Sequence, residues 1–202
     1  MTDKFDSGVI AVIRTDNPEY ALTLGRAFNK TSLSAIEVTM TVPNALEIIK
    51  VLINEGIQRV GLGTVRTVEQ VKEAAIIGAT FVVSPHSDEA VIKEAVQCGI
   101  SITPGAFTPS EIVRAVQWGA TSVKIFPIDA LGGISFVASI LEPLPDMPLV
   151  VSGGVQPEEV QSYLKLGVKG VCMGGALWSP EIVATGDIAR VREYALKAME
   201  RM

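Results

Sequence analysis

Hydrophobic positions along the chain fall into short runs that alternate with longer segments of mixed character. The runs are rich in β-branched residues, and their length is that of buried strands. They cover Val9–Ile13, Ala35–Thr39, Arg59–Leu62, Phe81–Ser84, Ser101–Thr103, Ser122–Phe126, Leu149–Ser152 and Gly170–Met173. The pattern therefore predicts eight strands at regular spacing.

Helical periodicity fills most of the intervals between these runs. It extends from Pro18 to Asn29 and from Pro43 to Glu55, and a last helix is predicted from about Asp187 to Met202. The remaining predicted helices begin at Val68, Asp88, Pro109 and Pro157. Strands alternating with helices favour a closed (β/α)8 barrel, the TIM barrel, over an open doubly wound sheet. We expect one α/β domain over residues 1–202.

The composition is typical of a folded protein, and the net charge is negative. Of the 202 residues, 48% are hydrophobic and 19% are charged, which excludes a disordered chain. The net charge of −5 argues against a nucleic-acid partner. A small anionic ligand remains compatible with it, because a few cations and helix N-termini can make a local positive site.

The two cysteines and the N-terminal segment indicate the cellular compartment of the protein. Cys98 and Cys172 do not suggest a disulfide framework, which favours reduced thiols and a cytoplasmic protein. The segment Met1–Asp6 lacks the basic and then apolar pattern of a signal peptide. No apolar run is long enough to span a bilayer, so we expect no membrane partner.

The predicted barrel assigns a position to the polar residues that end its strands. Active sites of such barrels lie at the C-terminal ends of the strands, where polar groups from different strands converge. The residues expected on this rim are Arg14, Glu37, Thr39, Gly63, Thr64, Pro85, His86, Lys124, Phe126, Ser152, Gly153, Gly154, Gly174 and Gly175.

Lys124 interrupts the apolar run Thr121–Pro127. Burial disfavours the charged form of a lysine, and a neutral amine can condense with a carbonyl substrate to form a Schiff base. The alternative is a side chain that extends along the strand end and keeps its ammonium in water.

Glu37 is the expected partner of Lys124. It interrupts another apolar run and shares the inward face with Thr39, which we count among the candidate substrate-binding residues. A carboxylate in this position can transfer protons. The alternative is a buried ion pair, which is a poor way to stabilise a core, so we favour chemistry.

Two glycine-rich segments predict a phosphate site. Ser152-Gly153-Gly154 and Gly174-Gly175 follow the last two predicted strands, where barrels often bind phosphate through backbone N–H groups.

His86 is the only histidine, and the cysteines are not spaced as a ligand pair, so we expect neither a transition metal nor a cofactor. Magnesium held by carboxylates remains an open alternative.

Six motifs together carry a resemblance to a known family. They are Glu37–Pro43, Gly61–Val65, Val83–His86, Pro104–Gly105, Lys124–Pro127 and Ser152–Val155. In this order they resemble the 2-keto-3-deoxy-6-phosphogluconate (KDPG) aldolase family, whose members often also act on 4-hydroxy-2-oxoglutarate (KHG). The resemblance runs from about Val9 to Trp178. It implies a (β/α)8 barrel and a metal-free class I aldolase, commonly a homotrimer, that cleaves its sugar acid phosphate to pyruvate and glyceraldehyde 3-phosphate.

The resemblance also implies roles for individual residues. Lys124 corresponds to the Schiff-base lysine and Glu37 to the general acid–base. Thr64 corresponds to a ligand of the pyruvate carboxylate. Pro85 and Phe126 correspond to walls of the site. Gly153 and Gly154 correspond to ligands of the phosphate.

Two positions depart from the pattern of the family. One branch has an arginine where this chain has Thr41, whereas a second branch resembles this chain and uses the arginine of the first strand, here Arg14, for the carboxylate. The family usually has a phosphate-binding serine near Gly175 or Ala176, and this chain has none there. We therefore assign the carboxylate to Arg14 and expect a weaker preference for phosphorylated substrates.

Three other functions remain open at this stage. The related 2-keto-3-deoxy-6-phosphogalactonate aldolases share much of the pattern. Another phosphate-binding barrel enzyme, such as an isomerase or synthase acting on a phosphorylated sugar, would need no Schiff base. A barrel that binds phosphorylated metabolites without converting them is the third, but it would leave the pairing of Lys124 with Glu37 without a purpose.

Overall fold

The structure is a computed structural model that describes residues 8–202. The segment Met1–Asp6, on which the expectation about a signal peptide depends, lies outside the described residues. Within the described part, no helix is long and apolar enough to cross a membrane.

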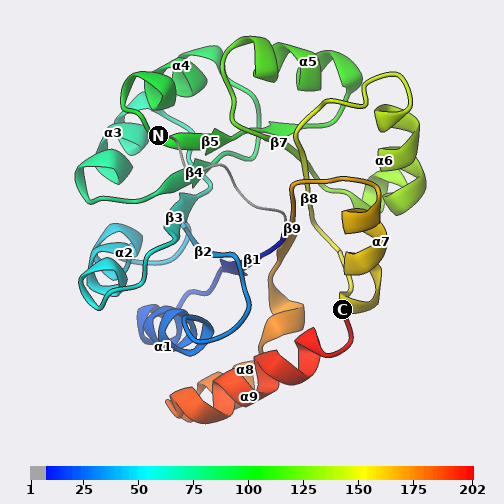
Figure 1. Ribbon diagram of the computed structural model, residues 1–202. Coiled ribbons are helices and arrows are strands. Elements are labelled where there is room, and N and C mark those ends of the chain that lie inside the picture. Colours follow the sequence, from blue (N-terminus) through cyan, green and yellow to red (C-terminus); the bar gives the residue numbers. More distant parts are fainter. Residues whose placement is uncertain (1–7) are drawn as a thin grey trace.

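A parallel sheet curls into a barrel at the centre of the molecule (Figure 1). The strand order is β5-β4-β3-β2-β1-β9-β8-β7-β6. The strands are β1 (Gly8–Ile13), β2 (Ala35–Thr39), β3 (Val60–Gly63), β4 (Phe81–Val83), β5 (Ser101–Thr103), β6 (Gly105–Ala106), β7 (Val123–Ile125), β8 (Leu149–Ser152) and β9 (Gly170–Met173).

The two strands at the ends of this order are neighbours in the chain, and only Pro104 separates them. Proline has no N–H to donate to a strand ladder, which interrupts the regular pairing at this point. Its carbonyl still accepts a hydrogen bond of 2.8 Å from the backbone N–H of Lys124. Strands β5 and β6 therefore act as one broken barrel strand, and the predicted (β/α)8 fold is confirmed.

Helices surround the barrel (Figure 1). They are α1 (Pro18–Phe28), α2 (Ala45–Asn54), α3 (Val68–Ile76), α4 (Glu89–Gln97), α5 (Pro109–Gln117), α6 (Gly133–Leu141), α7 (Val160–Lys165), α8 (Pro180–Val183) and α9 (Ile188–Met199), with 3₁₀ turns η1 (Asp129–Leu131), η2 (Pro157–Glu159) and η3 (Gly175–Leu177). Side chains of Thr67, Asp88 and Asp187 accept hydrogen bonds from the first turns of α3, α4 and α9, which explains where these helices begin.

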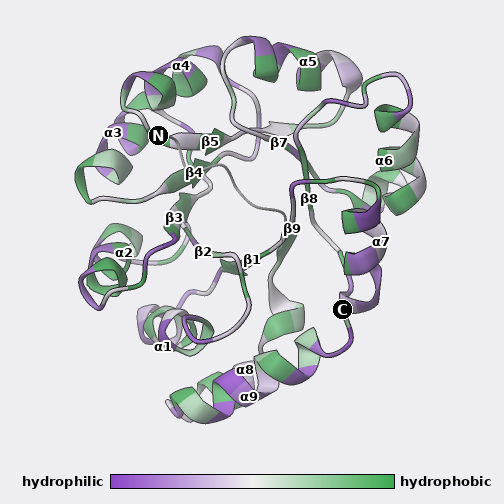
Figure 2. Cartoon of the chain, in the orientation of Figure 1, coloured by the Kyte–Doolittle hydropathy of each residue, from purple (hydrophilic) through white to green (hydrophobic). Residues whose placement is uncertain are grey.

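The helices differ from the sequence pattern most clearly at α6, α8 and α2. The sequence pattern predicts no helix over α6, which consists mostly of apolar residues (Figure 2), follows the left-handed Gly132 and has no side-chain cap at its start. It predicts none over the four residues of α8 either. Helix α2 begins at Ala45 rather than at Pro43, since Asn44 adopts the left-handed conformation with φ 59°. That conformation cannot continue a right-handed helix.

Two hydrophobic clusters fill the structure on either side of the sheet. The larger cluster lies between the outer face of the barrel and the helices. The smaller one fills the barrel interior and consists of Ile10, Ala35, Phe81, Val83, Val150 and Cys172. Phe81 is its largest member, and a Cβ atom on Gly61 would collide with its ring. A glycine on β3 therefore makes room for the aromatic ring that plugs the barrel beneath the rim.

Phe81→Ala should leave a cavity in the barrel interior and lower the free energy of unfolding by about 3–5 kcal/mol. Denaturant unfolding of the two proteins measures the difference. Phe107→Ala is the matched control, because this phenylalanine is 48% exposed and its truncation should change stability by no more than about 0.5 kcal/mol. Equal losses in the two variants would contradict the packing described here.

Candidate active site

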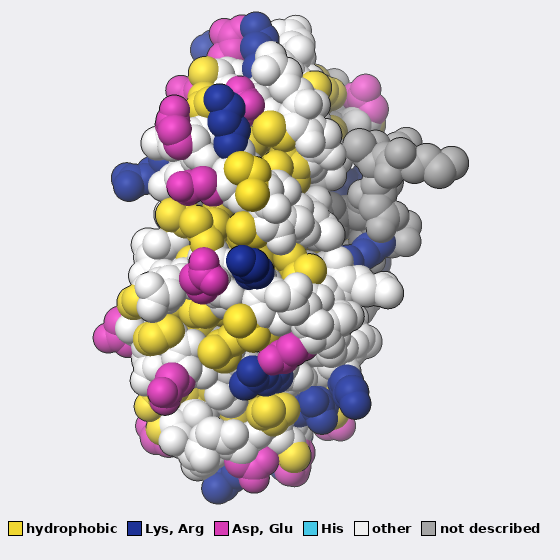
Figure 3. Space-filling view, turned by 90° about the vertical axis from the view of Figure 1, so that its left-hand side faces the viewer, with side chains coloured by type: hydrophobic (Ala, Val, Ile, Leu, Met, Phe, Trp, Pro, Cys, Tyr) yellow, Lys and Arg dark blue, Asp and Glu magenta, His cyan; other side chains and the backbone are white. Residues whose placement is uncertain are grey.

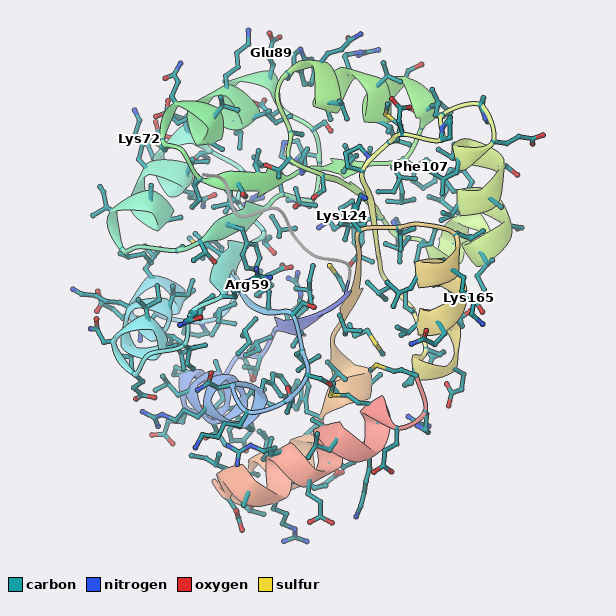
Figure 4. All side chains as sticks on the ribbon, viewed as in Figure 1. Arg59, Lys72, Glu89, Phe107, Lys124 and Lys165 are labelled. Carbon is teal, nitrogen blue, oxygen red and sulfur yellow. The ribbon has the colours of Figure 1, made fainter. Side chains whose placement is uncertain are left out.

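Lys124 lies in the middle of β7 and its side chain enters the barrel. The residue is only 7% exposed, and it pairs in register with Gly105 on β6 and Val150 on β8. In Figure 4 it lies near the middle of the ring of strands, whereas Lys165 lies on α7 at the outside. Its Nζ is 5.1 Å from the centroid of the Phe126 ring, so the aromatic face provides one wall around the amine.

Glu37 enters the same interior from β2 and is 4% exposed. Burial raises the pKa of its carboxyl group, and the positive charges of Lys124 and then of Arg14 act in the opposite direction. The carboxyl and the amine therefore interact electrostatically inside the barrel. A raised pKa makes the carboxylate a stronger base than that of an exposed glutamate.

Gly63 makes room for this carboxyl group. It lies on β3 beside β2, and a Cβ atom at this position would collide with Oε1 of Glu37 and lie 2.6 Å from its Cδ. The sequence analysis placed Gly63 on the rim without giving it a role. A glycine inside a strand is a recognised sign of close approach by another group, and that signal was available in the sequence.

Arg14 follows β1 and reaches across the rim to residues beyond the next two strands. Its Nη1 donates a hydrogen bond of 3.0 Å to Thr41 Oγ1, and its Nη2 donates one of 3.1 Å to Thr64 Oγ1. Thr64 has φ 62°, a left-handed conformation that is rare for a β-branched residue. Such strained residues cluster at functional sites, where the surrounding structure holds them in place.

Thr39 lies beneath the rim and is fully buried. Its hydroxyl donates to the carbonyl oxygen of Ile13 at 3.2 Å, and its Oγ1 is 2.8 Å from Thr41 Oγ1. Thr41 thereby joins Thr39 to Arg14. From the sequence, Thr41 was a departure from the family pattern and not one of the predicted site residues.

Pro85 and Phe126 line a cavity of about 240 Å³ beside the end of β7. Gly105 also lines this cavity. The backbone of Pro85 lies so close to it that a Cβ atom on Gly105 would collide with the carbonyl oxygen of Pro85. His86 also faces this cavity, as expected for a residue of the rim. The structure thus brings the two predicted wall residues together on one side of Lys124.

The loop after β8 carries the first glycine pair. Gly153 and Gly154 have φ 93° and 89°, which L side chains rarely adopt. The carbonyl of Gly153 accepts a hydrogen bond of 3.1 Å from the N–H of Asp129, so the loop docks on η1. A Cβ atom on Gly154 would lie 3.3 Å from Asp129 Oδ2. A carboxylate that the sequence analysis did not consider therefore borders the predicted phosphate site.

The loop after β9 carries the second glycine pair, Gly174 and Gly175, which begins the turn η3. Beneath it, Cys172 pairs in register with Ser152, and the side chains of these two residues are hydrogen-bonded. Burial raises the pKa of the Cys172 thiol to about 12, so this cysteine is a packing residue rather than a nucleophile. Over residues 8–202, no group of three or more His, Cys, Asp or Glu side chains is arranged to hold a metal ion.

Comparisons with known proteins identify the family of the chain. A family model described as KDPG and KHG aldolase matches residues 4–194. A 2-dehydro-3-deoxy-phosphogluconate aldolase of Pseudoalteromonas atlantica is 32% identical over 98% of this chain and 93% of its own. A probable 2-dehydro-3-deoxy-6-phosphogalactonate aldolase of Rhizobium meliloti is 32% identical over 89% of this chain and 85% of its own.

A solved structure shows the same architecture. It is a KDPG aldolase from Legionella pneumophila with pyruvate captured at low pH as a covalent carbinolamine intermediate. The two chains superpose with a TM-score of 0.85 and 27% identity, over 96% of this chain and 95% of the other. Together with the match to the family model over almost the whole sequence, this shows that the chain belongs to the KDPG and KHG aldolase family and is a lyase that cleaves carbon–carbon bonds.

Proposed function

We propose that the chain is a class I aldolase that cleaves KDPG to pyruvate and glyceraldehyde 3-phosphate and also accepts KHG, which it cleaves to pyruvate and glyoxylate. The observation that carries this proposal is a lysine and a glutamate buried together at the mouth of the barrel, 7% and 4% exposed. The capture of pyruvate as a covalent carbinolamine in the Legionella pneumophila aldolase supports the same chemistry here.

The reaction begins at the ketone of the substrate. Arg14 and Thr64 hold the carboxylate, while the amine nitrogen of Lys124 attacks the C2 carbonyl carbon. The carbinolamine loses water and becomes an iminium, which acts as an electron sink. Glu37 removes the proton of the C4 hydroxyl, directly or through a water molecule, and the C3–C4 bond breaks. The aldehyde leaves, the enamine is protonated, and hydrolysis releases pyruvate and the lysine.

The galacto epimer of KDPG is the second candidate substrate. The similarity to the Rhizobium meliloti relative, a probable 2-dehydro-3-deoxy-6-phosphogalactonate aldolase, supports it. Comparing kcat/KM for KDPG, its epimer and KHG ranks the three substrates directly.

The cytoplasm is the proposed location of the enzyme. Cys98 is exposed, Cys172 is buried, and both are free thiols. Free thiols are typical of reducing compartments.

Borohydride in the presence of pyruvate should reduce an iminium and add covalent mass at Lys124. Lys124→Ala should abolish both this trapping and aldol cleavage, because no other lysine of residues 8–202 is buried in the barrel. Mass spectrometry of the digested protein locates the adduct. Lys165→Ala is the matched control, since this lysine lies outside the barrel and should not affect trapping. An adduct at another lysine would contradict the assignment.

Glu37→Gln should separate iminium formation from cleavage. The amide cannot accept a proton, so cleavage should fall by roughly 10²-fold or more, while some trapping of pyruvate at Lys124 persists. The wild-type carboxyl group has a raised pKa and must be ionised to act as a base, so kcat/KM should rise with pH through that pKa. The variant should lose this limb of the pH profile; an unchanged limb would remove Glu37 from the mechanism.

Phosphate binding at the two glycine pairs should give KDPG a higher kcat/KM than its dephosphorylated analogue. The carboxylate of Asp129 borders Gly154 and repels a phosphate dianion, so Asp129→Asn should increase this preference. We expect roughly a two- to five-fold change, the scale of an interaction of up to ~1 kcal/mol between exposed charges. Asp146→Asn removes an equally exposed charge outside this loop and should leave the ratio unchanged. Equal wild-type kcat/KM values for the two substrates would exclude a phosphate site.

We also propose that the chain forms a homotrimer, as the family resemblance implies. Large hydrophobic side chains are exposed on the outer helices, among them Val51, Ile76 and Val96, at 37%, 83% and 53%. Figure 3 shows hydrophobic side chains among acidic and basic ones on the side that faces left in Figure 1. Light scattering at micromolar concentration should give three times the mass of the chain, and a monomer would refute the proposal.

A further inference from the structure

A continuous series of hydrogen bonds connects Arg14 to the backbone of its own strand. Arg14 Nη1 donates to Thr41 Oγ1 at 3.0 Å, Thr41 Oγ1 lies 2.8 Å from Thr39 Oγ1, and the Thr39 hydroxyl donates to the Ile13 carbonyl at 3.2 Å. The series ends at the residue that immediately precedes Arg14. The guanidinium is thus tied, through two hydroxyl groups of β2 and its following turn, to the end of β1.

Counting protons gives this series one direction. A hydroxyl group has a single proton to donate, and a carbonyl oxygen can only accept. The proton of Thr39 goes to Ile13, so Thr41 must donate its own proton to Thr39. Oγ1 of Thr41 then accepts from Arg14, which always donates. Every hydroxyl in the series has a defined orientation without any ligand present.

The base of the series is held more firmly than its outer end. Thr39 is fully buried, whereas Arg14 and Thr41 are exposed at the rim. Hydrogen bonds away from water are stronger and fix geometry better than those in solvent. An exposed arginine otherwise samples many rotamers and loses that freedom when it binds a ligand. The buried threonine therefore lowers the entropic cost of using Arg14 as a ligand-binding group.

Thr64 makes the second side-chain hydrogen bond to Arg14. Its Oγ1 accepts from Arg14 Nη2 at 3.1 Å, which leaves the Thr64 proton free to point toward a ligand. The backbone of the next residue, Val65, donates to the carbonyl of Val83 at 3.0 Å, so the left-handed turn at Thr64 is anchored to β4. An arginine with N–H groups to spare and an outward hydroxyl proton together suit the two oxygens of a carboxylate.

We propose that Thr39 and Thr41 form a hydroxyl relay that positions Arg14 for the carboxylate of a 2-oxo acid, and that this relay sets the preference for 2-oxo acids over uncharged ketones. The inference rests on the proposed aldolase function. It makes Thr39 a positioning residue beneath Arg14 rather than a group in contact with substrate. It also makes Thr41 part of the site in its own right.

Thr41→Val tests the relay, because valine keeps the shape of the side chain and removes the hydroxyl. Borohydride trapping is measured against concentration for two probes, pyruvate and methyl pyruvate, which has the same ketone but an esterified carboxylate. The variant should raise the half-saturating pyruvate concentration roughly 3- to 10-fold, the scale of the net contribution of one typical hydrogen bond. Trapping of methyl pyruvate should stay within about two-fold of wild type, because the ester offers Arg14 no negative charge.

Three further variants separate positioning from general damage. Thr41→Ser keeps the hydroxyl and should restore wild-type half-saturation. Thr39→Val removes the base of the relay and should shift half-saturation for pyruvate in the same direction as Thr41→Val. Thr185→Val is the matched control, since the Thr185 hydroxyl donates to the Ile182 carbonyl in the loop before α9 and should have no effect on either probe.

Different results would overturn different claims. A wild-type protein that forms no adduct at Lys124 would overturn the aldolase proposal, and the relay with it. If the wild type is trapped and Thr41→Val has unchanged half-saturation for pyruvate, only the relay is wrong. Equal losses for pyruvate and methyl pyruvate would also overturn the relay, because they would show that Thr41 supports the fold and not the recognition of a carboxylate.

Discussion

The burial of one carboxyl group and one amine at the mouth of the barrel is the constraint on which the rest of the structure depends. Removing two ionisable groups from water costs several kcal/mol for each ion, and a pair of this kind seldom repays that cost in stability. Glu37 and Lys124 come from strands on different sides of the barrel. The proposed aldol cleavage needs an amine and a proton acceptor close together in a buried site, and it accounts for their position.

Glycines and one aromatic ring make that space possible. Gly63 leaves room for the carboxyl group of Glu37, and Gly61, two residues earlier on the same face of β3, leaves room for Phe81. The ring fills the barrel interior below the polar layer, together with the other members of the smaller cluster. A single strand thus serves both the packing of the interior and the geometry of the site, which is why its two inward positions have no side chains.

The rim divides into halves of different electrostatic character. On one side, Arg14 is held by two threonines and offers positive charge to a carboxylate. On the other side, the glycine pair after β8 offers backbone groups, but Asp129 adds a negative charge beside them. Under the proposed function, the pyruvate half of the substrate has the better-defined binding site, and binding of the aldehyde half depends on a balance between backbone donors and one carboxylate.

The sequence by itself determined the barrel and the order of its strands along the chain, and it singled out Lys124 and Glu37 as charged residues in apolar runs. These features follow from local periodicity and from single charges in apolar runs, which depend on neighbouring residues alone. Helix α6 was not predicted because it follows Gly132 and has no side-chain cap that would mark its start. The tertiary structure alone decided which side chains meet across strands: Gly63 against Glu37, Thr41 between Thr39 and Arg14, and Asp129 against Gly154. Such contacts depend on the register of paired strands and on the closure of the barrel at Pro104, and neither leaves a periodic signal in the sequence.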